Sequence, residues 1–299
     1  MNTYRVYQVD SFTSEKFKGN PAGVIPNAEG LSEYDMQCIA RELNNSETVF
    51  IFSPDDSSHD VKLRYFTPTT EVPSCGHATI AAHYVRAIEN QLISSQVIQK
   101  IGIGILPIDI IKNDDYTIWM NQGTIEFSHP LANNDVHRLL SALGLTAEDV
   151  DERCPIQIVS TGHSKVMIGI KSRSTLNSLS PNMSMLIELS KAIGCNGYYV
   201  FTFAEPNNDV LTHGRMFAPA IGIPEDPVTG NANGPLGAYL VKHGLVQHDG
   251  ALFSFKGAQG KAIGRNGVVD VNVKIENDEP VQIKIGGKAV IVFKTQIEL

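Results

Sequence analysis

The stretch RYFTP at residues 64–68 returns as RMFAP at residues 215–219, an offset of 215 − 64 = 151 positions. Eleven residues after the start of the first copy comes CGHA (75–78), and fourteen after the start of the second comes TGNA (229–232). Strings this short also match by chance when taken singly. Matches in the same order with similar spacing indicate an internal repeat, and the repeat decides the fold.

The same predicted elements surround both copies. Residues 43–52 and 193–203 each combine the end of a helix with a run rich in Val, Tyr and Phe, which is typical of a strand. Each tetrapeptide then leads into an apolar stretch of helical character, and further on each half alternates around a polar turn, as a hairpin does. These stretches are residues 79–88 and 236–241 for the helices and residues 108–121 and 271–285 for the hairpins.

This order of elements predicts the fold class and the domain organisation. A chain of 299 residues is about twice the length of an ordinary domain. Strands outnumber helices and short turns join most of them, so each half is predicted to be an α+β unit in which a mostly antiparallel sheet wraps around a central helix. We expect an N-terminal lobe of residues 1–125, into which the C-terminal segment could cross, and a C-terminal lobe of residues 126–299 that repeats it.

Charge and composition exclude several classes of partner. The 24 basic and 32 acidic side chains give a net charge of −8, and no cluster of Lys or Arg is present to bind nucleic acid. The longest stretch without a charged side chain, residues 227–241, contains three glycines and two prolines, so no membrane span is expected. The chain begins with an alternating segment instead of a signal peptide, and we expect a cytoplasmic protein.

The cysteines and histidines do not predict a disulfide scaffold or a metal site. The four cysteines are sparse for this length and have no CxxC spacing. Two histidines in apolar surroundings, His77 and His83, are six residues apart, which places them on different faces of a helix. The glycines at residues 102–104 lack the spacing of a dinucleotide-binding turn. We therefore expect neither a metal nor a cofactor.

The positions at which the two copies differ indicate where chemistry could occur. Glu47 lies between a polar turn and a strand-like run, and the second copy has Gly197 at the matching place. A carboxylate at the start of a buried strand is partly desolvated, which suits a general base. The alternative interpretation, that Glu47 closes a surface turn, stays open at this point.

Two glycine-containing turns precede the predicted central helices. They are Cys75-Gly76-His77 and Thr229-Gly230-Asn231. The first N–H groups of a helix lack partners within the helix and lie at the positive end of its dipole, so such turns bind anions such as a carboxylate. Ordinary capping explains either turn alone, and their equivalence in the repeat favours a substrate-binding role.

Further polar side chains flank these turns. Asp226 precedes the second turn and His77 lies in the first, where either could orient a substrate or relay a proton. Cys75 is a candidate base or nucleophile because the N-terminus of a helix stabilises a thiolate. Its counterpart is Thr229, which excludes a mechanism with one thiol from each half. Asn20, in a GNPAG loop, is predicted to contact the substrate.

Taken together, four ordered motifs resemble the PhzF-like isomerase family, and within it the YddE branch. The motifs are GNPAGV (19–24), NNSETVF (44–50), EVPSCGHAT (71–79) and EDPVTGNA (225–232), and the resemblance covers essentially the whole chain. It implies the diaminopimelate-epimerase fold, a cofactor-free site and a homodimer. The family's acid/base glutamate falls on Glu47, its histidine on His77 beside Gly76, and its aspartate on Asp226. Where the phenazine enzyme has a serine, this chain has Asn231.

The sequence thus supports one main hypothesis and two alternatives. The main hypothesis is an isomerase that moves a proton within a small cyclic or unsaturated amino or hydroxy acid, with Glu47 as its general acid and base. An amino-acid racemase would need a second base, for which Cys75 is the candidate. A non-catalytic protein that binds small acids is the third hypothesis.

Overall fold

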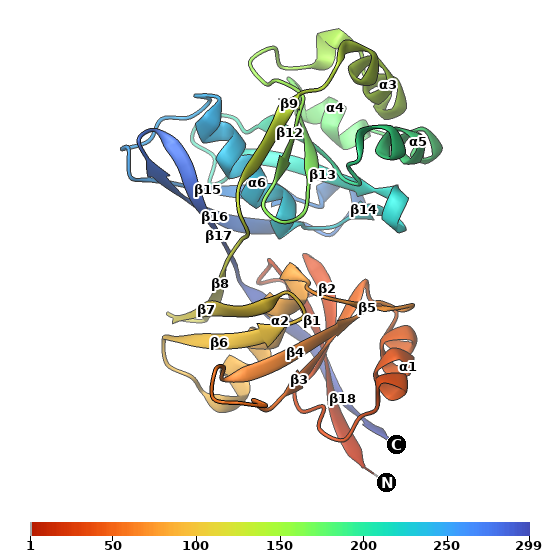
Figure 1. The fold of residues 1–299 in the computed structure, drawn as a ribbon, viewed down its shortest axis with the longest axis vertical. Helices are drawn as coiled ribbons and strands as arrows, with labels where there is room; N and C mark the ends of the chain where they lie inside the picture. The colour runs from red at the N-terminus through yellow and green to blue at the C-terminus, as the bar shows by residue number, and fades with distance from the viewer. Residues whose placement is uncertain (1) are drawn as a thin grey trace. The chain divides into compact units, whose positions relative to one another are not determined.

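The computed structural model describes residues 2–299, and they form two compact units (Figure 1). Unit 1 consists of residues up to 121 together with residues 286–299, and unit 2 consists of residues 122–285. The first change of unit thus lies four residues before the expected boundary at residue 125, and the last strand belongs to unit 1, a crossing that the sequence left open. Both units combine a mixed sheet with helices, and the predicted α+β class is confirmed.

Unit 1 is built around one buried helix. Its helices are α1 (Glu33–Leu43) and α2 (Gly76–Asn90). Its strands pair in the order β18–β1–β2–β3–β4–β6–β7–β8, with the short β5 on β4; the β2–β3 and β4–β6 pairs are parallel and the others antiparallel. The strands are β1 (Thr3–Ser11), β2 (Asn20–Ile25), β3 (Glu47–Phe52), β4 (Val61–Phe66), β5 (Glu71–Val72), β6 (Ser95–Ile101), β7 (Gly104–Lys112), β8 (Tyr116–Asn121) and β18 (Ala289–Glu298).

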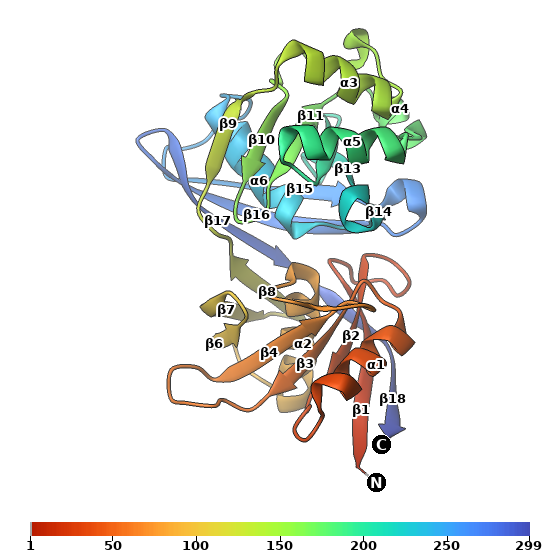
Figure 2. The same ribbon diagram turned by 45° about the vertical axis from the view of Figure 1, so that its right-hand side comes forward.

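The two helices of unit 1 differ in their surroundings. Helix α2 contacts β1, β2, β3, β8 and β18, and it is buried on nearly every side because Ala, Ile, Val and Tyr occupy all its faces. Helix α1 is amphipathic and begins in a capping box between Ser32 and Asp35. Figure 2 shows α1 lying along the strands of unit 1, against which it buries Met36, Ile39 and Ala40. Across residues 2–299, no helix is long and apolar enough to span a membrane.

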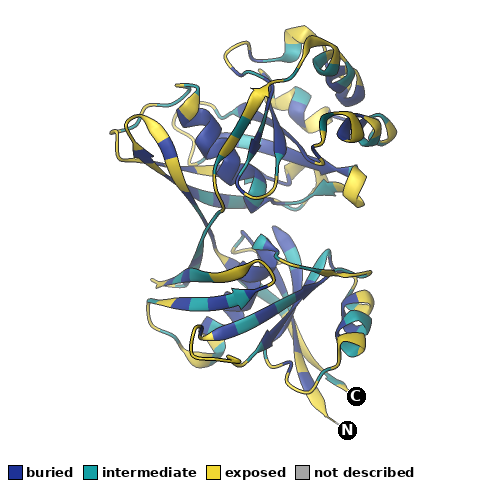
Figure 3. Ribbon diagram, viewed as in Figure 1, coloured by how far each residue is buried: buried dark blue, intermediate teal, exposed yellow. Residues whose placement is uncertain are grey.

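Unit 2 repeats this plan around α6 (Gly230–Lys242), which Figure 3 shows as almost wholly buried. The pairing order is β9–β10–β11–β12–β13–β15–β16, with β14 on β13 and with parallel pairs at β11–β12 and β13–β15. Its other elements are β9 (Glu126–Pro130), α3 (Asn133–Leu143), β10 (Gln157–Ser160), β11 (Lys165–Gly169), α4 (Arg173–Ser178), α5 (Met183–Ile193), β12 (Tyr198–Phe203), β13 (Thr212–Ala218), β14 (Ile223–Asp226), β15 (Leu252–Gln259), β16 (Gly267–Glu276) and β17 (Glu279–Gly287).

Strand register establishes which residues of the two units correspond. In unit 1 Phe50 pairs with Arg64, and in unit 2 Val200 pairs with Arg215. Counting three residues back from Phe50 reaches Glu47, and the same count from Val200 reaches Gly197. The equivalence that the sequence indicated for Glu47 and Gly197 is therefore confirmed.

The predicted helices and hairpins form, with corrected limits. Helix α6 begins at Gly230, six residues before the predicted start, since the glycines and Pro235 in its first turns hid the helical pattern. Strands β7 and β8 form the first predicted hairpin. In the second predicted hairpin, Asn277 and Asp278 form the turn between β16 and β17 and have positive φ angles of 53° and 60°. Short polar side chains such as these tolerate a positive φ better than other side chains do.

The repeat provides a matched pair for testing a buried ion pair. Arg215 donates two hydrogen bonds to Glu225, at 2.9 and 2.7 Å, and two to backbone carbonyls, while its counterpart Arg64 pairs with more exposed carboxylates. We expect Arg215→Met to lower the free energy of unfolding by about 3–5 kcal/mol, because it leaves the largely buried Glu225 carboxylate without its ion-pair partner. Arg64→Met should cost only about 1 kcal/mol. Calorimetry of both variants measures this, and equal losses would contradict the assignment.

The burial of a histidine in unit 1 predicts that the free energy of unfolding falls at acid pH. His83, on α2, is fully buried; its Nε2 lies 2.9 Å from Gln99 Oε1, and burial lowers its pKa to about 3. Below pH 6 the His83 imidazole is protonated in the unfolded chain and stays neutral in the folded chain. The free energy of unfolding therefore falls by up to about 1.4 kcal/mol per pH unit from pH 6 towards pH 3.

In His83→Gln this acid dependence should become shallower, whereas it should persist in the control His129→Gln, which changes an exposed histidine. The single tryptophan, Trp119, lies on β8 of unit 1, so urea titrations followed by its fluorescence report on the correct unit. If the free energy of unfolding falls with the same slope at acid pH in the wild type and in His83→Gln, the prediction is wrong.

Candidate active site

Three side chains converge in unit 1, at the start of β3 and of α2. Glu47 is the first residue of β3, Cys75 is the N-cap of α2, and His77 is its second residue. Nε2 of His77 lies 3.4 Å from a carboxylate oxygen of Glu47, and its Nδ1 lies 3.4 Å from the Cys75 sulfur. The Glu47 side chain is only 15% exposed and that of His77 only 9%. The structure therefore brings together three of the candidates that the sequence singled out.

Hydrogen bonds from neighbouring side chains hold the start of α2 in place. The Ser11 hydroxyl donates to the carbonyl of His77 at 2.7 Å, and the Thr79 hydroxyl donates to the carbonyl of Cys75 at the same distance. Ser46, which sequence reasoning missed, places its hydroxyl 3.3 Å from Nε2 of His77. These bonds restrict the movement of the His77 and Cys75 backbone, as an acid/base site requires.

The N-terminus of α2 lacks a capping bond from the side chain of its N-cap residue. Cys75 is extended and forms no side-chain cap. A Cβ atom on Gly76 would meet only the Met120 sulfur, at 3.9 Å, so neighbouring atoms do not impose glycine here. Backbone N–H groups at the positive end of a helix dipole can bind carboxylates, and such a role for this turn stays a prediction.

Unit 2 presents an equivalent turn with a different network. Thr229 is the N-cap of α6 and forms no capping bond from its side chain, because its hydroxyl donates to the carboxylate of Asp226. Gln259 donates to the carbonyl of Asp226 at 2.8 Å and accepts from the backbone N–H of Thr229 at 3.1 Å. The turn is thus fixed by Gln259, a residue 33 positions after Asp226 that no local pattern marks.

Other candidates are placed differently. Asn231 accepts a hydrogen bond from Gln122 at 2.9 Å, and Gly230 accepts one from the same amide at 3.1 Å. Asn20 is fully buried as the first residue of β2, where it pairs in register with Ser11. Asn20 therefore lies beside Ser11, whose hydroxyl holds the His77 carbonyl, and its contact with a substrate stays a prediction.

A buried lysine occupies the place in unit 2 that corresponds to Glu47. A Cβ atom on Gly197 would overlap the side chain of Lys165, which crosses in front of it from the adjacent strand β11. Lys165 is only 9% exposed, its ammonium donates to the Ser164 carbonyl at 3.1 Å, and burial lowers its pKa. The glycine that distinguishes the second copy therefore makes room for an amine.

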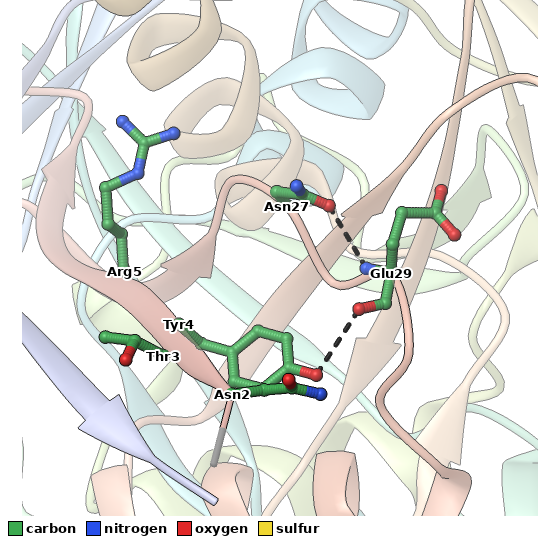
Figure 4. Close-up of a pocket in the computed structure, with 6 residues that line it drawn as sticks. All are labelled: Asn2, Thr3, Tyr4, Arg5, Asn27 and Glu29. Carbon is green, nitrogen blue, oxygen red and sulfur yellow. Dashed lines mark hydrogen bonds between the residues drawn. The ribbon is translucent and has the colours of Figure 1, made fainter.

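A separate pocket of about 400 Å³ lies near the start of β1 in unit 1 (Figure 4). Within it, Tyr4 donates to the carbonyl of Glu29 and the N–H of Glu29 donates to Asn27. It contains none of the residues of the Glu47 cluster. The pocket is lined by Asn2, Thr3, Tyr4, Arg5, Asn27 and Glu29.

Comparison with known proteins identifies the class to which this fold and cluster belong. The model of the phenazine biosynthesis-like (PhzC/PhzF) family matches residues 9–295, so the chain belongs to that family. An uncharacterized isomerase of Clostridium acetobutylicum is 62% identical over 297 residues, which are 99% of this chain and 98% of the relative. The uncharacterized isomerase YddE of Escherichia coli K12 is 50% identical, with 98% and 97% covered. The predicted membership of the PhzF-like family is confirmed, and the protein is an isomerase-type enzyme.

A more distant relative and two solved structures extend the comparison. The trans-2,3-dihydro-3-hydroxyanthranilate isomerase of Pseudomonas chlororaphis is 29% identical over 97% of this chain and 98% of its own. A PhzF-family protein of Bacillus anthracis matches all of both chains with a TM-score of 0.90 at 32% identity. A hydroxyproline epimerase of Agrobacterium vitis, at 12% identity and a TM-score of 0.63, covers 99% of this chain and 93% of its own. It shows the shared fold alone, and the diaminopimelate-epimerase-like fold is confirmed.

The buried amine predicts a stability difference that depends on pH. The unfolded chain keeps Lys165 protonated at neutral pH, whereas burial disfavours its charge in the folded chain, so the free energy of unfolding rises with pH towards the ordinary lysine pKa of about 10.4. Lys165→Met, which keeps the apolar stem, should raise Tm at pH 7 by a few degrees. This gain should shrink as the pH approaches 10.

Lys256→Met, which changes an exposed lysine on β15, serves as the control and should leave Tm nearly unchanged throughout. Calorimetry between pH 7 and pH 10 measures both variants. A Lys165→Met variant that is destabilised equally at every pH would show that the amine is held as a favourable charge.

Proposed function

We propose that the protein is a cofactor-independent isomerase that moves a proton within a small carboxylic acid, with Glu47 as general acid and base. The observation that carries this proposal is the largely buried Glu47 carboxylate, 3.4 Å from His77 and in the cluster at the uncapped N-terminus of α2. A desolvated carboxylate next to an anion-binding helix end can remove a proton from the carbon that neighbours a bound carboxylate.

In the proposed reaction one proton leaves carbon and returns to another position on the same molecule. The C–H bond breaks towards a Glu47 oxygen, and its electron pair passes into the conjugated system of the substrate. The N–H groups at the start of α2 stabilise the charge that develops there. Glu47, now protonated, then donates to the second position, so that no net proton, electron or cofactor is consumed.

His77 has a positioning role in this proposal. Nε2 of His77 lies 3.4 Å from one oxygen of Glu47 and can orient it, and the Ser46 hydroxyl lies 3.3 Å from the same ring nitrogen. Asp226 accepts a hydrogen bond from the Thr229 hydroxyl within unit 2, and its part in the reaction stays a prediction. The relative from Pseudomonas chlororaphis supports an unsaturated cyclic hydroxy or amino acid as the class of substrate.

The spacing of the cluster argues against the racemase alternative. Two bases that act on opposite faces of one carbon, each about 3–3.5 Å from it, are roughly 6–7 Å apart. Ligand atoms of Glu47, Cys75 and His77 all lie within 4.8 Å of one another. Cys75 and Glu47 therefore approach from one side, which favours a single base that carries the proton between two positions.

The decisive experiment follows the exchange of carbon-bound hydrogen with solvent. The purified protein is incubated in D₂O with a panel of cyclic amino and hydroxy acids, and deuterium uptake is read by mass spectrometry. We expect Glu47→Gln to lower uptake by at least about 100-fold, because general acid–base catalysis contributes about 10²–10⁴ in rate. Glu42→Gln, an exposed position on α1, should match the wild type.

Two outcomes would overturn the assignment. Equal uptake by the wild type and Glu47→Gln would remove Glu47 from the reaction. Ligands that raise Tm equally in the wild type and in Glu47→Gln, with no acid turned over by either, would instead identify a non-catalytic binding protein.

A further inference from the structure

We propose that Glu47, Cys75 and His77 form a binding site for a thiophilic divalent cation such as Zn²⁺, which would inhibit the enzyme reversibly. The three residues offer an oxygen, a sulfur and a nitrogen, all within 4.8 Å of one another. The inhibition rests on the proposed role of Glu47, whereas the binding does not. No other residue of the chain has to be recruited.

One of the two measured separations equals that around a tetrahedral zinc ion, and the other is about 0.4 Å longer. Bonds of about 2.0–2.2 Å to nitrogen and oxygen and about 2.3 Å to sulfur place neighbouring ligand atoms roughly 3.3–3.6 Å apart. The distance from Nε2 of His77 to the Glu47 oxygen is 3.4 Å, and the distance from the same nitrogen to the Cys75 sulfur is 4.0 Å. Small rotations of the side chains therefore suffice to surround the ion.

The surroundings of the cluster also suit a metal ion. The backbone of Cys75 and of His77 is held by the hydroxyls of Thr79 and Ser11, which reduces the entropy lost on binding. Three protein ligands leave a fourth position for water, as in open zinc sites. A nitrogen, a thiolate and one carboxylate favour zinc-class ions over Mg²⁺ and Ca²⁺, which prefer oxygen ligands.

A second group of potential ligands in unit 1 is less suited to bind a metal ion, because its carboxylates already pair with lysines. Asp55, Asp56 and His59 also lie within reach of a single ion. However, Lys62 lies 3.0 Å from Asp55, and Lys100 contacts both aspartates, so two ammonium groups already neutralise these carboxylates. Among the described residues 2–299, the Glu47 carboxylate forms its ion pair with His77 and not with a lysine or an arginine.

Inhibition follows from the chemistry of Glu47. A carboxylate lone pair that is donated to a cation is no longer available to accept a proton from carbon. His77 would be engaged by the same ion through the nitrogen that faces Glu47. Bound Zn²⁺ and proton transfer through Glu47 therefore exclude each other, and a chelator should restore the reaction.

The test reads metal binding directly, without a substrate. Reduced, metal-free protein is titrated with Co²⁺, which gives a thiolate-to-metal charge-transfer absorption when a cysteine is a ligand, and is then titrated with Zn²⁺ to displace it. We expect one ion per chain in the wild type. Cys75→Ala should lose the band and weaken Zn²⁺ binding by more than about 100-fold, since even loss of a partner behind a ligand costs about 10–100-fold.

Cys38→Ala is the matched control, because it removes a partly exposed thiol on α1 of the same unit and should leave the titration unchanged. Binding without the thiolate band, or equal Zn²⁺ affinity in Cys75→Ala and the wild type, would overturn the proposed site. Deuterium uptake separates the two proposals: if Glu47→Gln exchanges normally while Cys75→Ala loses Zn²⁺, the metal site stands and the role of Glu47 in proton transfer fails.

Discussion

The constraint on which the rest of this structure depends is the burial of a whole helix inside each sheet. Helices α2 and α6 are apolar on nearly all sides, so the ends of each helix are its main polar features. Neither N-terminus is closed by a capping side chain, and each begins with a residue held in an extended conformation. Sheet wrapping thus creates, in each unit, a set of directed N–H groups that can receive an anion. Because the net charge of −8 does not attract an anion, the proposed carboxylate substrate would depend on these local dipoles.

Around this shared frame the two units have diverged in their ionisable groups. Unit 1 has a carboxylate, Glu47, at the start of its third strand, and unit 2 has Gly197 there with the Lys165 amine across it. The arginine that both copies retain is buried in unit 2 and more exposed in unit 1. Each difference changes which charge is desolvated, and desolvation decides whether a group stabilises the fold or performs chemistry.

The Glu47 cluster also shows why a proton-transfer site and a metal site are close relatives. Both need ionisable side chains that are partly desolvated, held by hydrogen bonds and not neutralised by a permanent cation. Asp55 and Asp56 fail the last condition because lysines pair with them. Glu47, beside a histidine and a thiol, meets all three conditions.

Much of this protein could be predicted from its sequence, because repetition, capping and strand alternation are local patterns. They identified the two α+β units, the approximate positions of the central helices, and Glu47, His77 and Asp226 as candidates. What the sequence could not supply are the contacts between segments distant along the chain. Glu47 lies 28 residues from Cys75 (75 − 47 = 28), Gln259 fixes the turn after Asp226, and β18 returns to unit 1.

The physical reason is strand register and parallel pairing, which no local periodicity encodes. Parallel pairing of β2 with β3 sets Glu47 at one end of the sheet, and the burial of α2 brings Cys75 and His77 to the same place. The sequence by itself determined which groups are chemically capable. Only the tertiary structure decided which of them meet, because long-range pairing alone sets the distances between them.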